Sequence, residues 1–263
     1  MSRTTYLALA VATRMTTDVP LLWMFVAVHL AWPGHGGLEN VLRNAGAFIV
    51  WALIHSLLAR DAGRQVVSRW VGPDFVRIAY VIIAGLTLCG VLLAWRPVSG
   101  RVWGATGPLA WVLSALYVAS LVALVSITLH FDYAEFLGLR HLADRVARRP
   151  PRPAALSVEG PYAYCRHPMY LAMLAAFWLG PVMTFGRLEF AILSTLYLLI
   201  GLRFEECNLR RELGPEYDLY CASVPMLVPR LTAWRLPEGS GGRPRSASGS
   251  RGSDVDAARG ATR

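Results

Sequence analysis

The sequence predicts an all-α integral membrane protein with about six transmembrane helices, five to six in all. Three observations predict this class. Charged residues make up 16% of the 263 residues and hydrophobic residues 55%, whereas soluble domains carry about 25% charged residues. Long apolar runs recur along the chain, and the basic residues gather in alternate connections between these runs. The composition therefore indicates a chain that is surrounded mainly by lipid.

Near-continuous apolar stretches are the candidate membrane helices. They are residues 19–32, 41–59, 75–95, 108–130, 169–185 and 188–202. An α-helix needs about 20 residues to cross the hydrocarbon core. The third and fourth stretches reach that length, the second and fifth are slightly short, and the first and last need flanking residues. The count of five or six crossings depends on the first stretch. We do not expect residues 1–14 to be a signal peptide, because no small-residue cleavage site follows a compact apolar run.

The net charge of +9 comes with 26 arginines and no lysine. With six crossings, the loops 33–40, 96–107 and 183–187 lie on one side of the membrane. Few arginines fall on that side, counting the flanking helix ends: Arg43, Arg96, Arg101 and Arg187. Cytoplasmic loops carry the excess of basic residues, so we expect both termini and the 131–168 loop in the cytoplasm. This topology explains the charge, and we expect no nucleic-acid partner.

Composition also divides the chain into segments. The predicted segments are 1–135 (N-terminal membrane helices), 136–156 (a basic, proline-rich cytoplasmic loop), 157–232 (a region with a helical hairpin) and 233–263 (a basic tail). Residues 136–148 are a candidate amphipathic helix at the anionic leaflet. Gly180-Pro181 is expected to kink the first arm of the hairpin, which turns at 183–187. The tail is expected to be disordered, because it has few apolar residues.

The cysteines do not predict a disulfide or a metal site. The chain has four cysteines and no CxxC pair. Cys165, Cys207 and Cys221 fall on the predicted cytoplasmic side, where thiols stay reduced. Cys165 and His167 would supply only two metal ligands, too few for a zinc site.

The stretch "GPYAYCRHPMYLAM" (160–173) is the first candidate site. Pro168 fits the first turn of a helix, where free N–H groups and the positive end of the helix dipole attract anions. Arg166 and His167 add donors directly before this turn, and Tyr162, Tyr164 and Tyr170 add aromatic faces. The pattern suits a carboxylate or a phosphate. The alternative is a membrane-interface anchor, in which the arginine meets lipid phosphate.

The second candidate cluster is "RFEECNL", with Arg203, Glu205 and Glu206 at the end of the last apolar stretch. Adjacent helical residues point about 100° apart, so one carboxylate can face a pocket while Glu206 pairs with Arg210 four residues on. A helical hairpin brings this cluster and residues 166–170 to the same membrane face. A ligand with its own carboxylate, ammonium and aromatic base would match. The alternative is a solvated helix end.

The two clusters resemble a known family. "GPYAYCRHPMYLAM…FEECNLRRELGPEYDLYCASVPMLVPR" is similar to the C-terminal signature of the isoprenylcysteine carboxyl methyltransferase and phospholipid methyltransferase superfamily. "IHSLLAR" (54–60), "RIAYVIIAGLTL…WRP" (77–97) and "LHFDYAEFLGLR" (129–140) resemble its bacterial methanethiol S-methyltransferase branch. The resemblance implies an integral membrane enzyme that uses S-adenosylmethionine, with its cofactor site at the cytoplasmic face of the C-terminal half. It also implies a bacterial inner membrane.

The resemblance also implies which residues bind the methyl donor. Several positions match donor contacts in the superfamily, with Arg166 and Arg203 as neighbouring cations: Leu156, Ser157, Tyr162, His167, Pro168, Met169, Tyr170 and Glu205. The spacing from Arg203 differs from the eukaryotic pattern. Glu205 and Glu206 are therefore interchangeable at this point, and Glu206 is a candidate catalytic residue.

Two histidines are candidates for the side of the methyl acceptor. His55 lies about four residues from the cytoplasmic end of its helix, and His130 ends another helix beside Asp132. Ionisable side chains inside a membrane are functional candidates, although a lone helix histidine is often only a hydrogen-bonded core residue. Their common depth with His167 favours His55, His130 and Asp132 as catalytic candidates.

The resemblance implies an S-adenosylmethionine-dependent methyltransferase that S-methylates a small thiol, with methanethiol converted to dimethyl sulfide. A lipid amine or a prenyl-cysteine carboxylate is the alternative acceptor. A non-enzymatic membrane protein of the same superfamily is the alternative from another class. The expected partners are the small thiol and the lipid bilayer, and the oligomeric state stays open.

Overall fold

The computed structural model describes residues 3–30, 35–130, 133–150, 156 and 158–235. Five helices in this part of the chain are long and apolar enough to cross a membrane, and a sixth apolar helix, Pro168–Trp178, is shorter. The predicted all-α integral membrane protein is confirmed. The predicted disordered tail lies outside the described residues from position 236 onward.

The helices lie in the order that the apolar stretches predict. The membrane helices are α1 (Arg3–Leu30), α2 (Leu38–Ala59), α4 (Val76–Ala94), α5 (Gly107–His130), α8 (Pro168–Trp178) and α9 (Phe185–Leu213). Shorter helices are α3 (Asp61–Val71), α6 (Tyr133–Phe136), α7 (Leu139–Val146) and α10 (Pro215–Ser223), with 3-10 turns at Pro73–Phe75 and Gly160–Ala163. Strands β1 (Arg101–Gly104) and β2 (Val182–Thr184) form an antiparallel pair.

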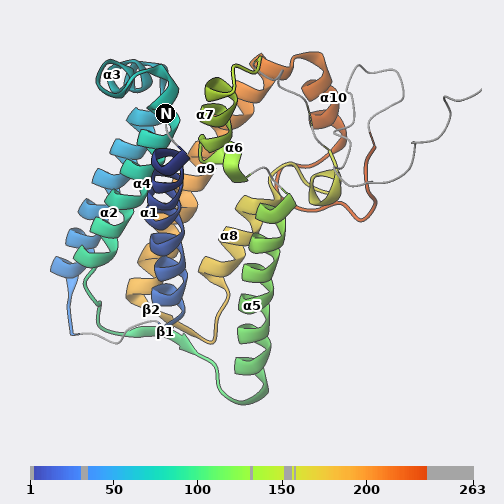
Figure 1. Cartoon of the computed structure of the whole chain (residues 1–263). Helices are drawn as coiled ribbons and strands as arrows, with labels where there is room; N and C mark the ends of the chain where they lie inside the picture. The colour runs from blue at the N-terminus through green and yellow to red at the C-terminus, as the bar shows by residue number, and fades with distance from the viewer. Residues whose placement is uncertain (1–2, 31–34, 131–132, 151–155, 157, 236–263) are drawn as a thin grey trace, which may run out of the picture.

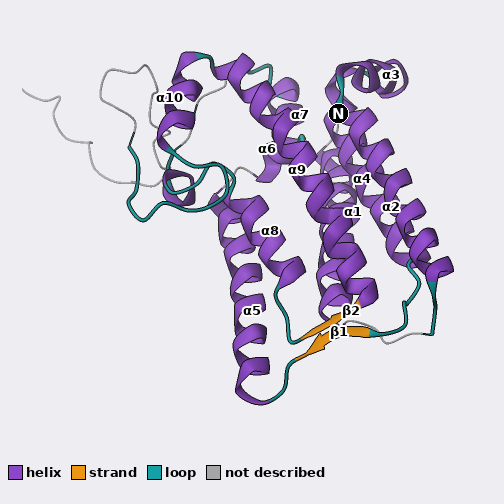
Figure 2. Cartoon of the chain, turned by 180° about the vertical axis from the view of Figure 1, so that it is seen from behind, coloured by secondary structure: helices purple, strands orange, loops and turns teal. Residues whose placement is uncertain are grey.

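The six membrane helices run alternately up and down, so both ends of the described chain lie at one end of the bundle (Figure 1). We call this the site end, because α3, α6, α7 and α10 also lie there. The β1–β2 pair closes the opposite end, which we call the ribbon end (Figure 2).

Helix α1 is longer than predicted. The apolar stretch predicted residues 19–32, but the helix begins at Arg3. Its polar side chains find partners on the helix or beside it. Thr13 and Thr17 donate to carbonyls one turn earlier, both at 2.8 Å, and Asp18 accepts a hydrogen bond from Tyr133 of α6. The first helix is therefore long enough to span the membrane.

Helix α8 is shorter than predicted. The sequence predicted one helical arm over 169–185 with a kink at Gly180-Pro181, but the helix ends at Trp178. The Arg187 side chain is 4% exposed and donates to carbonyls at and beyond this end: Ala176, Phe177, Leu179 and Val182. Gly180 has φ +151°, and a Cβ there would lie 2.3 Å from Nη1 of Arg187. The guanidinium replaces the next helical turn, and glycine leaves room for it.

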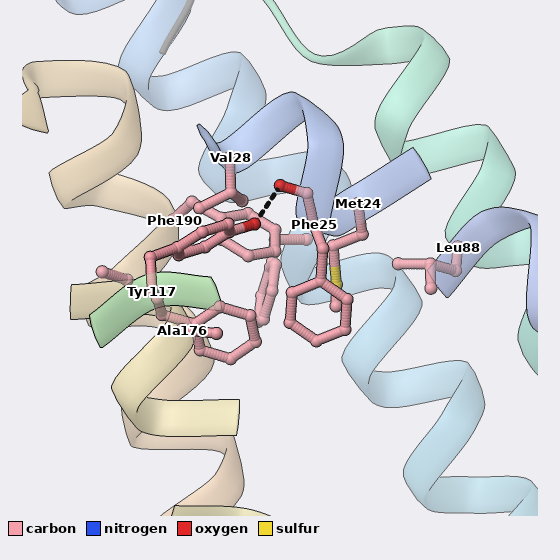
Figure 3. Packing of buried hydrophobic residues seen from close by; sticks show 10 residues of the cluster. Met24, Phe25, Val28, Leu88, Tyr117, Ala176 and Phe190 are labelled. Carbon is pink, nitrogen blue, oxygen red and sulfur yellow. Dashed lines mark hydrogen bonds between the residues drawn. The ribbon is translucent and has the colours of Figure 1, made fainter. Parts of the chain in front are cut away.

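The main core joins all six membrane helices. Its buried residues are Met24, Phe25, Val28, Phe48, Leu88, Tyr117, Ala176, Phe177, Phe190 and Ala191 (Figure 3). The Tyr117 hydroxyl of α5 donates to the Phe25 carbonyl of α1 at 2.7 Å. This bond satisfies a buried hydroxyl and ties α5 to the rest of the bundle.

A second core holds the predicted amphipathic helix. The sequence predicted a helix over 136–148, and the structure has α7 within that range. Leu139 and Leu142 of α7 are buried against Ile78 and Val81 of α4. The apolar face of α7 therefore packs on the protein at the site end.

Candidate functional site

Glu206 of α9 is the centre of a buried polar network at the site end. Its two carboxylate oxygens accept from Nε and Nη2 of Arg166 at 2.9 and 3.0 Å. His167 Nε2 lies 2.6 Å from Oε1, and the Tyr217 hydroxyl donates to Oε1 at 3.0 Å. Glu206 is 7% exposed, so the charge is stabilised by direct partners. We call these four residues the Glu206 network.

The Glu206 network joins the 160–170 stretch to the last described segment. Arg166 Nη1 donates to the carbonyls of Cys221 and Val224 at 3.0 and 2.5 Å. The backbone N–H groups of Arg166 and His167 donate to the carbonyls of Pro225 and Met226 at 3.0 and 3.1 Å. Side chains and backbone therefore hold residues 221–226 against the turn that begins α8.

Aromatic packing strengthens this junction. Tyr217, Tyr220 and Val224 form a buried cluster, and Leu156 packs against it. The Tyr220 hydroxyl donates to the Tyr162 carbonyl at 2.5 Å. Burial raises the pKa of both tyrosines, and the Glu206 charge raises the pKa of Tyr217 further. Both hydroxyls therefore stay protonated and act as hydrogen-bond donors.

Glu205 has different surroundings from its neighbour. It is only half-buried, and its Oε2 accepts a 2.6 Å hydrogen bond from the Tyr170 hydroxyl of α8. Burial raises the pKa of the Tyr162 phenol, and the nearby Glu205 charge raises it further. A carboxylate with one tyrosine partner and an exposed side can still receive a cation, whereas Glu206 is already occupied.

The start of α8 lies beside Glu205. Pro168 is the buried first residue of the helix, and Met169 and Tyr170 follow it, both half-buried. Their N–H groups precede the first helical hydrogen bond, which Leu171 makes to His167. They carry the positive end of the helix dipole. Donors for an anion and an acceptor for a cation thus lie side by side.

One predicted pair is wrong, and one predicted residue lies apart. Glu206 does not pair with Arg210, which donates instead to Asp218 of α10 at 2.9 Å. The buried network turns Glu206 toward Arg166, away from the helix surface where Arg210 lies exposed. Arg203 is exposed, and the structure does not bring it into the network.

His55 of α2 meets two tyrosines inside the bundle. The Tyr80 hydroxyl of α4 lies 2.9 Å from Nε2, and the Tyr197 hydroxyl of α9 lies 2.7 Å from Nδ1. Ser56 lies 3.3 Å from the Tyr197 hydroxyl. Tyr197 lies on α9, about two helical turns before Glu205. The cluster around His55 and the Glu205 side of the site are therefore neighbours.

Three other candidates cannot be placed. Asp132 and Ser157 lie outside the described residues, and His130 ends α5 with a side chain that is not described. Sequence reasoning missed Tyr80, Tyr197 and Tyr217. Tyrosine is common in helical cores. The one available signal was a polar hydroxyl within an apolar stretch, which needs a hydrogen-bond partner when it is buried.

The described residues include no group of three or more His, Cys, Asp or Glu side chains that could hold a metal ion. Cys165 is buried and Cys221 is half-buried, and both are free thiols. Burial raises the pKa of each thiol, so the neutral form predominates at neutral pH.

Comparisons with known proteins find relatives for most of the chain. No family model and no solved structure matches it. The chain is 36% identical to "Methanethiol S-methyltransferase 2" of Bradyrhizobium diazoefficiens over 199 residues, 75% of this chain and 76% of that protein. It is 33% identical to "Methanethiol S-methyltransferase" of Mycobacterium tuberculosis, covering 73% and 79%. It is also 31% identical to "Nurim" of Xenopus laevis, covering 77% and 73%.

Proposed function

The chain, which is also similar to Nurim, belongs to the family of the methanethiol S-methyltransferases, and on this premise we propose that it methylates methanethiol to dimethyl sulfide with S-adenosylmethionine. The observation that carries the proposal is the position of Glu205. This acid is half-buried, bonded to Tyr170, and lies beside the free N–H groups that begin α8.

The residues at this position fit the methyl donor. S-adenosylmethionine would supply a methyl group on a positively charged sulfur, and it also carries a carboxylate, an ammonium and an aromatic base. The first-turn N–H groups of Met169 and Tyr170 suit the carboxylate. Glu205 suits a positive group, and the faces of Tyr162 and Leu156 suit the base. All five residues lie half-buried at the site end.

We assign Arg166, His167 and Glu206 a supporting role. Their side chains are occupied by one another and by Tyr217. They hold the turn before α8 in place, so that the donor groups of that turn keep one geometry. Glu206 therefore affects the reaction by holding the turn before α8 in position, and Glu205 is the acid that faces the donor.

The protein contributes mainly by aligning the methyl donor with the thiol and by excluding water from the site. A positive sulfonium and a thiolate neutralise each other as the methyl group moves, so a site with little water favours the transfer. Fixing both partners in line supplies much of the remaining acceleration. A site at the end of the bundle receives the charged donor from the aqueous side and the small apolar thiol from the bilayer. The arginine distribution supports placing this end on the cytoplasmic side, and we propose a bacterial inner membrane.

The proposal is tested with the purified protein in lipid nanodiscs and S-adenosylmethionine that carries a labelled methyl group. Methanethiol, hydrogen sulfide, phosphatidylethanolamine and a prenyl-cysteine are offered in parallel. We expect label in dimethyl sulfide, and none after Glu205→Gln. Label in the lipid or the prenyl-cysteine alone would replace the thiol as acceptor. No labelled product from any acceptor, with the donor bound or unbound, would favour a non-enzymatic protein.

A further inference from the structure

Three membrane helices each bring one polar ring to a common point. His55 of α2, Tyr80 of α4 and Tyr197 of α9 meet there, with Ser56 beside Tyr197. We call these four residues the His55 cluster. Polar side chains inside a membrane protein are costly unless they serve a function or satisfy one another. The Trp51 ring lies 5.2 Å from the His55 ring and shields it on one side.

Both ring nitrogens of His55 are already occupied. Nε2 lies 2.9 Å from the Tyr80 hydroxyl, and Nδ1 lies 2.7 Å from the Tyr197 hydroxyl. A neutral imidazole has one donor nitrogen and one acceptor nitrogen. One phenol must therefore donate to the ring while the other accepts from it. A substrate cannot reach either nitrogen without displacing a tyrosine, so His55 meets a thiol only through a phenol.

The two phenols are not equivalent. The Tyr197 hydroxyl has two partners, His55 and Ser56. Among the residues that the structure describes, the Tyr80 hydroxyl has His55 alone. Tyr80 thus keeps an open acceptor position on its oxygen. The guanidinium of Arg77 lies 5.5 Å from the centre of the Tyr80 ring, which favours transient negative charge on the phenol oxygen and opposes lasting positive charge on His55. The histidine ring must therefore pass its proton on.

We propose that Tyr80 is the catalytic residue that takes the proton from the acceptor thiol, and that His55 and Tyr197 act behind it as positioning residues. This inference rests on the proposed function and deepens it. It also changes the role that the sequence suggested for His55, which acts here through Tyr80. The His55 cluster shares α9 with Glu205, which is bonded to Tyr170 in the donor site.

The proton balance of the step is complete. As the thiol sulfur forms its new bond to carbon, its S–H proton passes to the Tyr80 oxygen. The Tyr80 proton passes at the same time to Nε2 of His55, so the phenol stays neutral before and after. The ring becomes an imidazolium that donates from Nδ1 to Tyr197, and it then releases one proton to water. The methyl donor loses its positive charge, so one proton leaves per turnover and no oxidant or reductant is needed.

This direction of transfer requires one tautomer. Nε2 must be free to accept, so the resting proton must sit on Nδ1 and point to Tyr197. The Tyr197 hydroxyl accepts it and can donate to Ser56 in turn. The charged and titratable groups around the pair are Arg77, Arg64, Tyr197 and Tyr170.

The first test compares two thiols of different acidity in nanodiscs. Methanethiol needs a base near neutral pH, whereas the fluorinated 2,2,2-trifluoroethanethiol is more acidic and needs less help. Tyr80→Phe should lower methanethiol turnover by about a hundredfold or more, and turnover of the fluorinated thiol by less than about tenfold, because a well-placed base contributes about 10²–10⁴-fold. Raising the pH should restore methanethiol turnover in the variant, because thiolate then forms without the protein.

The matched control is Tyr117→Phe, which removes a buried hydroxyl from the core near the ribbon end. It should slow both thiols equally or not at all. Equal losses for the two thiols in Tyr80→Phe would overturn the relay and make Tyr80 structural. Wild-type protein that methylates neither thiol would instead overturn the proposed function, so the two failures are distinct.

The second test does not depend on turnover. Histidine labelled with nitrogen-15 reports its tautomer by NMR, and loss of one signal in His55→Gln identifies His55 among the six histidines. We expect the proton on Nδ1 in the wild type, and a shift toward the Nε2–H form in Tyr197→Phe. A resting His55 with its proton on Nε2 would overturn the proposed direction. S-adenosylmethionine affinity by calorimetry should stay within about threefold of wild type in Tyr80→Phe, since loss of a contact to a charged group costs about tenfold or more.

Discussion

Two adjacent acids at the end of α9 have opposite surroundings. Glu206 is buried and receives hydrogen bonds from Arg166, His167 and Tyr217. Glu205 is half-buried and bonded to Tyr170. The difference follows from the helix, because consecutive side chains point about 100° apart. Glu206 therefore serves the fold, while Glu205 remains available to a ligand.

Replacing each acid by glutamine separates these roles. Glu206→Gln should lower the free energy of unfolding by about 3–5 kcal/mol, because Arg166 loses its buried counter-charge. Glu205→Gln should leave stability within about 0.5 kcal/mol, as expected for a change outside a buried network, and should weaken S-adenosylmethionine binding at least tenfold. Thermal unfolding in detergent and calorimetry measure the two effects. Equal thermal shifts for both variants would show that the division between the acids is wrong.

The thiols near the site should react slowly at neutral pH. Burial raises the pKa of Cys165 and Cys221, so less thiolate is present than in a free cysteine. Since a raised thiol pKa moves deprotonation to higher pH, maleimide labelling of Cys221 should accelerate steeply above about pH 8.5, the ordinary thiol pKa. Cys207 is exposed and should label first at every pH. Mass spectrometry of peptides after timed labelling measures the order.

At the scale of single residues, the sequence predicted which side chains gather better than it predicted how they pair. Arg166, His167 and Tyr170 were predicted from a charged motif at a helix start, and Glu205 from the acidic pair at the end of the last apolar stretch. The partner of Glu206 was predicted wrongly. Arg210 is the nearest basic residue on the same helix, but the actual partner, Arg166, comes from a distant segment that local spacing does not reveal. Tyr80 and Tyr197 were missed, because the sequence around a tyrosine in an apolar helix does not show which residues of other helices it contacts.

At the scale of elements, α8 shows how one side chain ends a helix. Arg187 enters from α9 and donates to carbonyls at and beyond the end of α8. Those carbonyls would otherwise be buried without partners. The Thr184 hydroxyl accepts from the Arg187 N–H at 3.2 Å and begins α9. One arginine therefore fixes the turn between the two helices that form the site.

Arg187→Leu should lower the free energy of unfolding by about 3 kcal/mol or more, since each buried carbonyl left unpaired costs about 1–3 kcal/mol. Donor affinity should fall as well if α8 shifts. Arg43→Leu removes an exposed arginine near the same end and serves as the control. An Arg187 variant as stable as this control would show that water or the backbone satisfies these carbonyls instead.

Composition predicted the membrane helices because burial in lipid demands apolar side chains over a whole crossing. The same reasoning predicted α8 too long, because Gly180 and Pro181 lie in an apolar run and the capping role of Arg187 depends on tertiary contact. The β1–β2 pair was not predicted for a similar reason. Its strands lie about 80 residues apart in the chain, and a four-residue strand has too little pattern to detect.

At the scale of the whole molecule, six alternating helices place α10, α7 and the described start of the chain at one end (Figure 1). Most arginines lie at this end, so we expect it in the cytoplasm. A membrane-impermeant maleimide should therefore leave Cys207 unlabelled in intact cells and label it after permeabilisation. Labelling of Cys207 from outside intact cells would reverse the orientation.

The closing of the site by residues 217–226 has a consequence for biosynthesis. The ribosome adds this segment after every membrane helix. Until then Glu206 lacks its bond from Tyr217, and Arg166 and His167 lack their carbonyl partners in residues 221–226. A nascent chain can therefore insert its helices into the bilayer before the pocket exists. On the proposed function, we expect ligand binding to begin only when translation is nearly finished. Ribosome-arrested chains that end shortly after α9 should be inserted in the membrane and yet fail to retain the methyl donor.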